Sequence, residues 1–298
     1  MILLGMLTLL SCKMRIIFED KLGLNNLLSK FDSLTNLVSI CMKKQEDWKA
    51  IVLEGHHNYL PNLSIDCVVL GFHDNQLKVL LLKPKQKKEW ALPGGFVLLN
   101  ETIEEAGSRT LYERTGLKDT FLEQFHTFSD PDRTKRHSSV EEFKNIGIDI
   151  QPDNWTTKRF LTVGLYALVE FSKVVPRPNV LSDYCEWWDI HKIGDLILDH
   201  NKILNKALEV LRLQLKYKPI GYNLLPQKFT LSELQKLYET LLDRKLDRGN
   251  FNRKILSYNF LTNLDEKKSG VAHKAPFLYS FNLEMYKKAL AEGLSGGI

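Results

Sequence analysis

The sequence predicts an α/β protein in two parts: an α/β/α sandwich built on a mixed sheet, followed by a smaller winged helix-turn-helix domain. Up to about residue 217, segments with strand character alternate with segments of helical periodicity. Beyond that point, two helical segments precede a charged turn and an apolar strand. The charge divides in the same place, because the first 217 residues are neutral and residues 218–298 carry the whole excess of +5.

Composition sets the broad class of the protein. The 298 residues are 44% hydrophobic and 26% charged, which is typical of globular proteins and leaves room for about two domains. No apolar run approaches the roughly 20 residues of a membrane span. The four cysteines are scattered without a C-x-x-C pair, which argues against a disulfide framework or a zinc site. We therefore expect a cytoplasmic protein without a metal site or cofactor, and no membrane partner.

The chain begins with a segment that needs separate treatment. Leu9-Leu10-Ser11-Cys12 resembles a lipoprotein cleavage site, but no Lys or Arg precedes the apolar stretch, as a signal peptide requires. We favour an over-extended gene start, with Met42 as the true beginning, and assign no role to the extension 1–45. The sandwich domain is then expected over residues 60–217 and the winged helix over 218–290.

Strand and turn signals order the first domain. A polar turn at 72–76 joins two β-rich runs into a hairpin. The segment 129–158 is long and polar, which predicts a surface excursion where ligand selectivity can reside. The remaining expected elements are strands at 64–71, 77–83, 121–128, 160–171 and 185–190, a helix at 197–215 and a linker at 217–225.

One helix, predicted over 101–115, carries the most informative pattern. Thr102 stands three residues before Glu105, the spacing of a capping box, and Gly116 is placed to end the helix. Gly94-Gly95 predicts a turn before it. Its expected core-facing residues are Ile103, Ala106, Gly107, Thr110 and Leu111.

This segment resembles the Nudix box, whose signature is G-x5-E-x7-R-E-U-x-E-E-x-G-U with U aliphatic. The matching residues are Gly95, Glu101, Arg109, Leu111, Glu113, Gly116 and Leu117, preceded by Trp90-Ala91-Leu92-Pro93-Gly94-Gly95-Phe96-Val97. Thr110 and Arg114 stand where the family keeps glutamates. A chance match on an ordinary surface helix is the less favoured explanation.

The two departures change the chemistry that the helix can support. Residues three and four apart are neighbours on a helix, so positions 110, 113 and 114 share a face. Three glutamates there would hold Mg²⁺ for diphosphate hydrolysis, whereas this chain offers a hydroxyl, a carboxylate and a guanidinium. We expect no catalytic residue and no metal, hence no enzyme. The alternative is a Mg²⁺-dependent hydrolase of ADP-ribose or a related nucleoside diphosphate compound, with a metal relocated to Glu101, Glu104 and Glu105.

The C-terminal segment has a pattern of its own. Thr230 and Glu233 form a second capping box before an apolar helix face, and a second helix is expected over 248–260 with Phe251, Ile255, Leu256 and Phe260 inward. A lysine-tipped turn at 264–270 and a strand at 276–281 complete a winged helix.

Polar and basic side chains of this segment are candidates for DNA contact. Asn250, Asn252 and Arg253 are our candidates for reading bases, and lysines and arginines for binding phosphates. The whole candidate set is Thr230, Ser232, Arg248, Asn250, Asn252, Arg253, Lys254, Lys267, Lys268 and Lys274. A helical cap with solvated charges, or an adaptor that binds protein, would give the same pattern.

From Leu63 to Tyr286 the chain resembles the Nudix-related transcriptional regulators. Beside the Trp90–Val97 stretch, the resemblance rests on Leu198-Asp199-His200, Leu224-Leu225-Pro226, Phe229-Thr230-Leu231 and Asn250-Phe251. It implies a homodimer in which a degenerate Nudix-like domain binds a small-molecule effector and two winged helices bind double-stranded DNA at an inverted-repeat operator. Some members sense ADP-ribose and control NAD biosynthesis; others, in Bacteroidetes, control the use of arabinose and related sugars.

One departure from the pattern of the related regulators bears on the identity of the effector. In regulators of the NAD type, an Asp-Pro-Arg-like stretch leads almost directly into the next strand, but here Asp130-Pro131-Asp132-Arg133 keeps part of that pattern and a longer excursion, 136–158, follows. We therefore favour a sugar or sugar metabolite, with an ADP-ribose-type nucleotide second. The candidate effector-binding residues are Trp90, Phe96, Glu113 and Arg133.

A few further residues have structural explanations. We expect His200 to be a cap or packing group, and His56 and His57 to be surface residues without a carboxylate at ligand spacing. We expect Glu113 to pair with Arg109. Strand alternation would send one of Trp187 and Trp188 inward and the other outward.

Overall fold

The computed structural model describes residues 49–85, 87–118, 120–134, 140–145, 147–178, 182–270 and 275–294. The chain divides into two units, Met1–Lys49 and Ala50–Ile298, and every element described below belongs to the second. The extension 1–45 lies outside the described residues. Within those residues, no helix has both the length and the apolar character that crossing a membrane demands.

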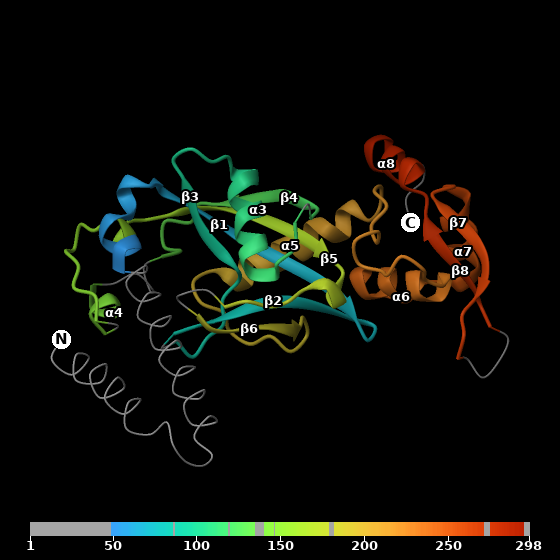
Figure 1. Cartoon of the computed structure of the whole chain (residues 1–298), viewed down its shortest axis with the longest axis horizontal. Helices are drawn as coiled ribbons and strands as arrows, with labels where there is room; N and C mark the ends of the chain where they lie inside the picture. The colour runs from blue at the N-terminus through green and yellow to red at the C-terminus, as the bar shows by residue number, and fades with distance from the viewer. Residues whose placement is uncertain are drawn as a thin grey trace, which may run out of the picture. The chain divides into compact units, whose positions relative to one another are not determined.

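A six-stranded mixed sheet forms the centre of the first domain, as predicted (Figure 1). The strands run in the order β4-β5-β1-β2-β6, and β3 pairs with β1 outside that path. β1 and β5 are parallel, and the other pairs are antiparallel. The bounds are β1 Tyr59–His73, β2 Gln76–Pro84, β3 Gly94–Leu98, β4 Leu122–Phe128, β5 Leu161–Val169 and β6 Ser182–Asp189. The turn predicted at Gly94-Gly95 is wrong, because both glycines begin β3 and pair with β1.

The predicted hairpin is present but its turn is shorter than expected. β1 and β2 pair up to His73 and Gln76, so only Asp74 and Asn75 form the loop. Both have positive φ, 49° and 58°. Asp and Asn tolerate this left-handed conformation better than most residues, and it suits the tightest hairpin turns. The turn predicted at 72–76 is therefore too long, because Phe72, His73 and Gln76 belong to the two strands.

Two helices, α3 (Ile103–Thr115) and α5 (His200–Gln214), cover opposite faces of the sheet (Figure 1). Alternate residues of β1 serve the two cores: Cys67 and Val69 pack in the cluster that contains Leu111 of α3. Val68 and Leu70 pack in the cluster that contains Ile203 of α5. This alternation confirms the α/β/α sandwich.

Both faces being covered also corrects the expectation for the tryptophan pair. Trp187 packs against the α3-side core and Trp188 against the α5-side core, so neither points to open solvent. The indole Nε1 of Trp188 is buried without a hydrogen-bond partner among the described residues.

The local signals of α3 act as predicted. The Thr102 hydroxyl accepts a hydrogen bond from the Glu105 amide, the Glu105 carboxylate accepts one from the Thr102 amide, and Gly116 ends the helix with a φ of 74°. Ala106, Gly107, Thr110 and Leu111 are buried and Ile103 is partly buried. Gly107 allows the helix to pack closely, since a Cβ there would lie 2.4 Å from Leu122 Cδ2 and 2.5 Å from Leu165 Cδ1.

The C-terminal elements form the predicted winged helix. Their bounds are α6 Leu231–Leu242, α7 Arg248–Ser257, β7 Leu261–Lys267, β8 Phe277–Phe281 and α8 Leu283–Glu292. Phe229 forms an isolated antiparallel bridge with Tyr279 of β8. The capping box of Thr230 and Glu233 is present. Phe229, Phe260, Phe281 and Tyr286 pack together as an aromatic core.

Three details of this domain differ from expectation. α7 ends at Ser257, and Leu256 is 40% exposed, so it does not face the core. β7 continues to Lys267, so the turn predicted at 264–270 begins later. The helix α8 was not predicted.

The linker is packed into the structure instead of being a free connection. Ile220 is buried, and its amide donates to the Tyr238 hydroxyl of α6. The Tyr286 hydroxyl of α8 donates to the Pro219 carbonyl. The connection between the domains is therefore held by the winged-helix side of the chain.

The excursion 129–158 is also anchored where it is described. It contains two short helices, α4 (Val140–Asn145) and η2 (Trp155–Thr157). The Trp155 indole and the Asn154 amide both donate to the Val52 carbonyl. The end of the excursion thus packs beside the segment that precedes β1.

Candidate functional site

Arg109 organises the outer surface of the Nudix-box helix. Its Nε donates to Glu101 Oε1 at 2.7 Å, and its Nη2 donates to Glu101 Oε2 and to the Phe96 carbonyl, both at 2.9 Å. Glu101 also accepts from the Leu98 amide at 2.9 Å. The hydrogen bond from Arg109 lowers the pKa of Glu101. Arg109 therefore ties α3 to the end of β3 with an ionised carboxylate between them.

Glu113 lies between two guanidinium groups. Its Oε1 is 3.5 Å from Arg109 Nη1, and its Oε2 is 3.2 Å from Arg114 Nη2. The predicted pair with Arg109 is confirmed, and the contact with Arg114 is additional. The Glu113 side chain is 40% exposed, whereas that of Arg114 is only 11% exposed. One exposed carboxylate thus pairs with both arginines.

Thr110 and Arg114 turn toward the interior from the same helix. Thr110 is 1% exposed and Arg114 is 9% exposed. The Thr110 hydroxyl and the Arg114 Nε are buried and have no hydrogen-bond partner among the described residues. Burial lowers the pKa of Arg114, while Glu113 opposes that shift. The site therefore contains two polar groups whose hydrogen-bonding capacity is unused.

The three metal positions of the Nudix box do not fit Mg²⁺ in this chain. Mg²⁺ requires hard oxygen ligands, usually carboxylates and water. Glu113 is the one carboxylate among the three positions, and both of its oxygens already contact arginines. Arg114 has only donors and remains cationic in proteins. The Thr110 hydroxyl and the Arg114 guanidinium can instead donate hydrogen bonds to an anion.

An aromatic cluster borders this surface. Phe96, whose carbonyl accepts from Arg109, packs edge-on against Trp155 at 4.8 Å between ring centroids. Tyr59 stacks on Trp155 at 6.0 Å, and Phe160 packs against Phe96 at 5.5 Å. Burial raises the pKa of Tyr59, and the charge of Arg109 opposes this shift. Tyr59 and Trp155 were missed from the sequence, because they are brought here by tertiary structure alone.

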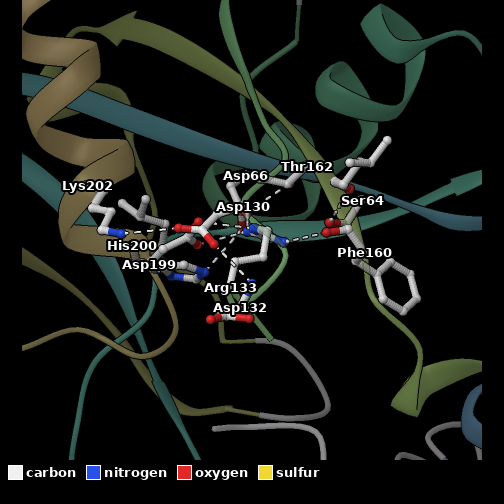
Figure 2. Close-up of polar contacts among 12 residues, drawn as sticks. Ser64, Asp66, Asp130, Asp132, Arg133, Phe160, Thr162, Asp199, His200 and Lys202 are labelled. Atoms are coloured by element: carbon white, nitrogen blue, oxygen red, sulfur yellow. Dashed lines mark hydrogen bonds and ion pairs between the residues drawn. The ribbon is translucent and has the colours of Figure 1, made fainter. Parts of the chain in front are cut away.

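Arg133 lies in a second, buried charge network (Figure 2). Its Nε and Nη2 donate to the two Asp199 oxygens at 3.0 and 2.9 Å, and Nη2 is 3.5 Å from Asp66 Oδ2. Thr162 donates to the same Asp66 oxygen at 2.8 Å. His200 Nε2 is 3.5 Å from Asp66 Oδ1, and its Nδ1 accepts from the Leu92 amide. The expected packing role of His200 agrees with this arrangement.

The predicted effector residues therefore divide into two places. Phe96 and Glu113 lie beside Arg109 on the α3 side of the sheet. Trp90 packs against Trp188 in the α5-side core. Arg133 also lies on the α5 side, is 6% exposed, and has its guanidinium engaged by two carboxylates. The set is not one site, because its members lie on opposite faces of the sheet.

The histidine pair near the start of the described chain needs one correction. His56 and His57 are exposed, as expected. A carboxylate does lie close to them, however, since Glu54 is 3.5 Å from His57 Nε2. Ligand atoms of Glu54, His56 and His57 all lie within 4.8 Å of one another. The expectation that no carboxylate stands at ligand spacing was wrong.

The second helix of the winged domain presents the predicted polar surface. Asp247 caps α7 by accepting from the Asn250 amide, and Arg248, Asn250 and Arg253 are exposed. Arg253 Nη2 donates to Asn250 Oδ1 at 3.0 Å. Phe251 and Ile255 hold the other face of the helix in the core. This fixes the exposed side chains on a rigid element.

Other members of the predicted DNA-binding set are placed less favourably. Thr230 is corrected: it is 3% exposed and its hydroxyl is used in the capping box. Asn252 and Lys254 are half-buried, and Ser232 is exposed. On the wing, Lys267 lies over the Phe277 ring and Lys268 pairs with Glu233 at 2.6 Å. Lys274 lies outside the described residues.

Comparison with known proteins agrees with this two-domain architecture. The NUDIX domain model matches residues 61–211, and the model of the NrtR DNA-binding winged helix domain matches residues 221–281. The chain is 30% identical over 234 residues to the ADPR responsive transcriptional repressor NtrR of Acinetobacter baylyi, covering 76% of this chain and 84% of that protein.

Two further matches address the fold and the first domain. A crystal structure of Shewanella oneidensis NrtR matches with a TM-score of 0.59 and 25% identity, covering 76% of this chain and 96% of that one. An ADP-ribose pyrophosphatase of Methanocaldococcus jannaschii is 38% identical over 96 residues, or 31% of this chain and 52% of that protein.

A Nudix domain followed by a DNA-binding winged helix defines a transcriptional regulator that binds DNA. This chain belongs to the NrtR family of such regulators.

Proposed function

We propose that this protein is a cytoplasmic, homodimeric regulator whose Nudix-like domain binds ADP-ribose or a closely related nucleotide and thereby changes its affinity for an operator. The observation that carries the proposal is the match across both domains to a repressor described as ADPR responsive. The surface around Arg109 supports it, because cationic groups lie beside aromatic rings there. Arginines suit a diphosphate and aromatic rings suit a base.

ADP-ribose replaces the sugar favoured from the sequence. That preference rested on the long excursion 129–158, but the repressor that matches most of this chain is named for ADPR. The excursion also delivers Trp155 to the aromatic cluster instead of separating it from the Nudix helix. Phe96 remains a proposed effector contact, and Tyr59 and Trp155 join it. Glu113 stays within the proposed effector site as the partner of Arg109 and Arg114. Trp90 and Arg133 are assigned to the α5-side core.

The proposed operator contacts lie on α7 and the wing. Arg248 and Arg253 would bind phosphates or base edges, and Asn250 would read a base in the major groove. Ser232, Asn252, Lys254, Lys267 and Lys268 remain supporting candidates. A dimer would place two such helices on an inverted repeat, so a small effector-induced change in their spacing or tilt would alter binding strongly.

The decisive experiment is DNA binding by the purified protein at two salt concentrations. Fragments upstream of its own gene and its neighbours would be tested with ADP-ribose, with arabinose and other pentoses, and without ligand. We expect selective, salt-sensitive binding that ADP-ribose changes and pentoses do not. A response to a pentose alone would return the effector assignment to sugars, and an absence of any selective binding would remove the regulator function.

Hydrolysis remains the second candidate, since the match to an ADP-ribose pyrophosphatase covers the domain that carries the box. The residues at positions 110 and 114 argue against it. Incubation with ADP-ribose and Mg²⁺, followed by separation of AMP and ribose 5-phosphate, tests it directly. Turnover that depends on Mg²⁺ would establish an enzyme.

A further inference from the structure

The substituted Nudix helix differs from a metal site in its charge as well as its ligands. The box in this chain holds four carboxylates and two guanidinium groups, and two of the carboxylates, Glu101 and Glu113, contact the guanidinium groups of Arg109 and Arg114. With glutamates at positions 110 and 114, the same helix would be strongly negative. A diphosphate could approach that surface only with divalent cations, whereas here Arg109 and Arg114 offset part of the negative charge.

Glu113 marks a position that an anionic group can occupy. Its two oxygens lie 3.5 Å from Arg109 and 3.2 Å from Arg114. Carboxylates and phosphates make similar contacts with guanidinium groups, so a phosphate placed there would meet the same two donors. The Glu113 side chain is 40% exposed and is free to turn toward solvent when a ligand arrives.

The unused polar atoms of the helix point to the same conclusion. Arg114 Nε and Thr110 Oγ1 are buried and unpartnered among the described residues. Leaving a buried polar group unpaired costs roughly 1–3 kcal/mol, and more for a charged group. An anion that draws the Arg114 guanidinium and the Thr110 hydroxyl toward it would satisfy both groups. A divalent cation would leave the Arg114 guanidinium unsatisfied, because a guanidinium has only donors and repels a cation.

We infer that Arg114, together with Arg109, takes the place of the divalent cation, so that this Nudix domain binds the diphosphate group of its effector without a metal. The inference rests on the proposed function, since it concerns how ADP-ribose would be held. It assigns Arg114 as a ligand-binding residue, not as a passive remnant of a lost active site. It also gives Glu113 a second role as an internal anion that the ligand displaces.

The test is calorimetric titration of the full chain with ADP-ribose, in buffer with excess EDTA and in buffer with excess MgCl₂. We expect the same affinity in both buffers. Binding that requires Mg²⁺ would overturn the inference and leave ADP-ribose as the effector. Binding in neither buffer would remove the proposed effector, and the inference with it.

Variants make the assignment specific to Arg114. Arg114→Gln should weaken metal-free binding by roughly 10- to 100-fold, the range expected when a hydrogen-bonded charge is removed. The matched control is Lys206→Gln, which removes an equal charge from a half-exposed position on α5. Equal losses in both variants, or no loss in Arg114→Gln while circular dichroism shows a folded protein, would overturn the role of Arg114.

A double substitution tests whether arginine has taken the place of the divalent cation. Thr110→Glu with Arg114→Glu restores carboxylates at both positions, and we expect it to abolish binding in EDTA and to create binding that depends on Mg²⁺. Thermal unfolding with and without Mg²⁺ provides a second readout, because a bound metal stabilises the folded state in proportion to its affinity. Unchanged binding in EDTA would contradict the inference.

Discussion

Two charge networks lie on opposite faces of β1, and they differ in burial and in how completely they are hydrogen-bonded. Asp66 faces α5 and joins Arg133 and Asp199, whose side chains are 10% exposed or less. The next residue, Cys67, faces α3, where Arg109 and Glu113 are 32% and 40% exposed. The first network has every guanidinium nitrogen of Arg133 paired, whereas the second leaves Arg114 Nε unpartnered among the described residues.

This difference separates a structural role from a binding role. A buried charge is tolerated only when it is paired and hydrogen-bonded, and Arg133 meets that condition. Its network joins the segment after β4 to β1, β5 and the start of α5. The α3 network is partly exposed and incompletely hydrogen-bonded, which is typical of a surface that binds a ligand. Substitutions should therefore affect mainly folding in one network and mainly ligand binding in the other.

The largest expected effect is on stability in the buried network. Arg133→Ala leaves Asp66 and Asp199 without their common cation, and we expect a loss of about 3–5 kcal/mol in the free energy of unfolding. Chemical denaturation measures it. Lys206→Ala, which breaks the exposed pair with Glu209, serves as the control and should cost at most about 1 kcal/mol. Similar values for the two variants would remove the distinction between the networks.

A smaller effect is expected at Glu101, where the two roles overlap. Its side chain is 9% exposed and accepts from Arg109, so Glu101→Gln should cost about 1–3 kcal/mol. The pKa of Glu101 is lowered from 4.5 by the hydrogen bond from Arg109. The folded state thus binds fewer protons, and the stabilisation is present above pH 4.5 and is lost as pH falls through the folded pKa. The difference between wild type and variant, measured by denaturation across pH, should shrink on acidification; a constant difference would contradict this.

In the winged domain we expect a comparable loss, in DNA affinity instead of stability. Arg253→Ala with Lys254→Ala should weaken operator binding by about 1–3 kcal/mol or more, and reduce the salt dependence by about one unit of slope for each phosphate contact removed. Fluorescence anisotropy at several salt concentrations measures both. The control is Lys287→Ala with Lys288→Ala on α8, two exposed lysines outside α7 and the wing. If operator binding stays intact in the α7 variant, α7 is not the recognition helix.

The sequence predicted the frame of both networks and the pair of Glu113 with Arg109, but not the partners of Arg133. Capping boxes at Thr102 and Thr230, the left-handed Gly116 and the helical periodicity are local signals, and the structure confirms them. Arg133 was chosen as an effector contact because its motif resembled one in related regulators. Its two carboxylate partners lie 66 and 67 positions away in the chain, so no local pattern could reveal that it is buried.

The same limit applies to the aromatic cluster and to the wing. Trp155 reaches Tyr59 and Phe96 because the excursion folds back on the segment before β1. On the wing, β7 continues through charged residues to Lys267, because pairing with β8 outweighs their weak strand preference. Long-range pairing decides both cases.

The smallest expected effect on stability is at Glu113. Glu113→Gln removes an exposed carboxylate, so stability should change by less than about 1 kcal/mol. ADP-ribose affinity should nevertheless rise several-fold, because the ligand no longer competes with Glu113 for Arg109 and Arg114. Calorimetric titration in EDTA measures the gain, with Glu104→Gln, an exposed carboxylate on the same helix, as the control. A weaker affinity in Glu113→Gln would mean that Glu113 is a direct effector contact, and that the α3 network is organised around it instead of being opened by its displacement.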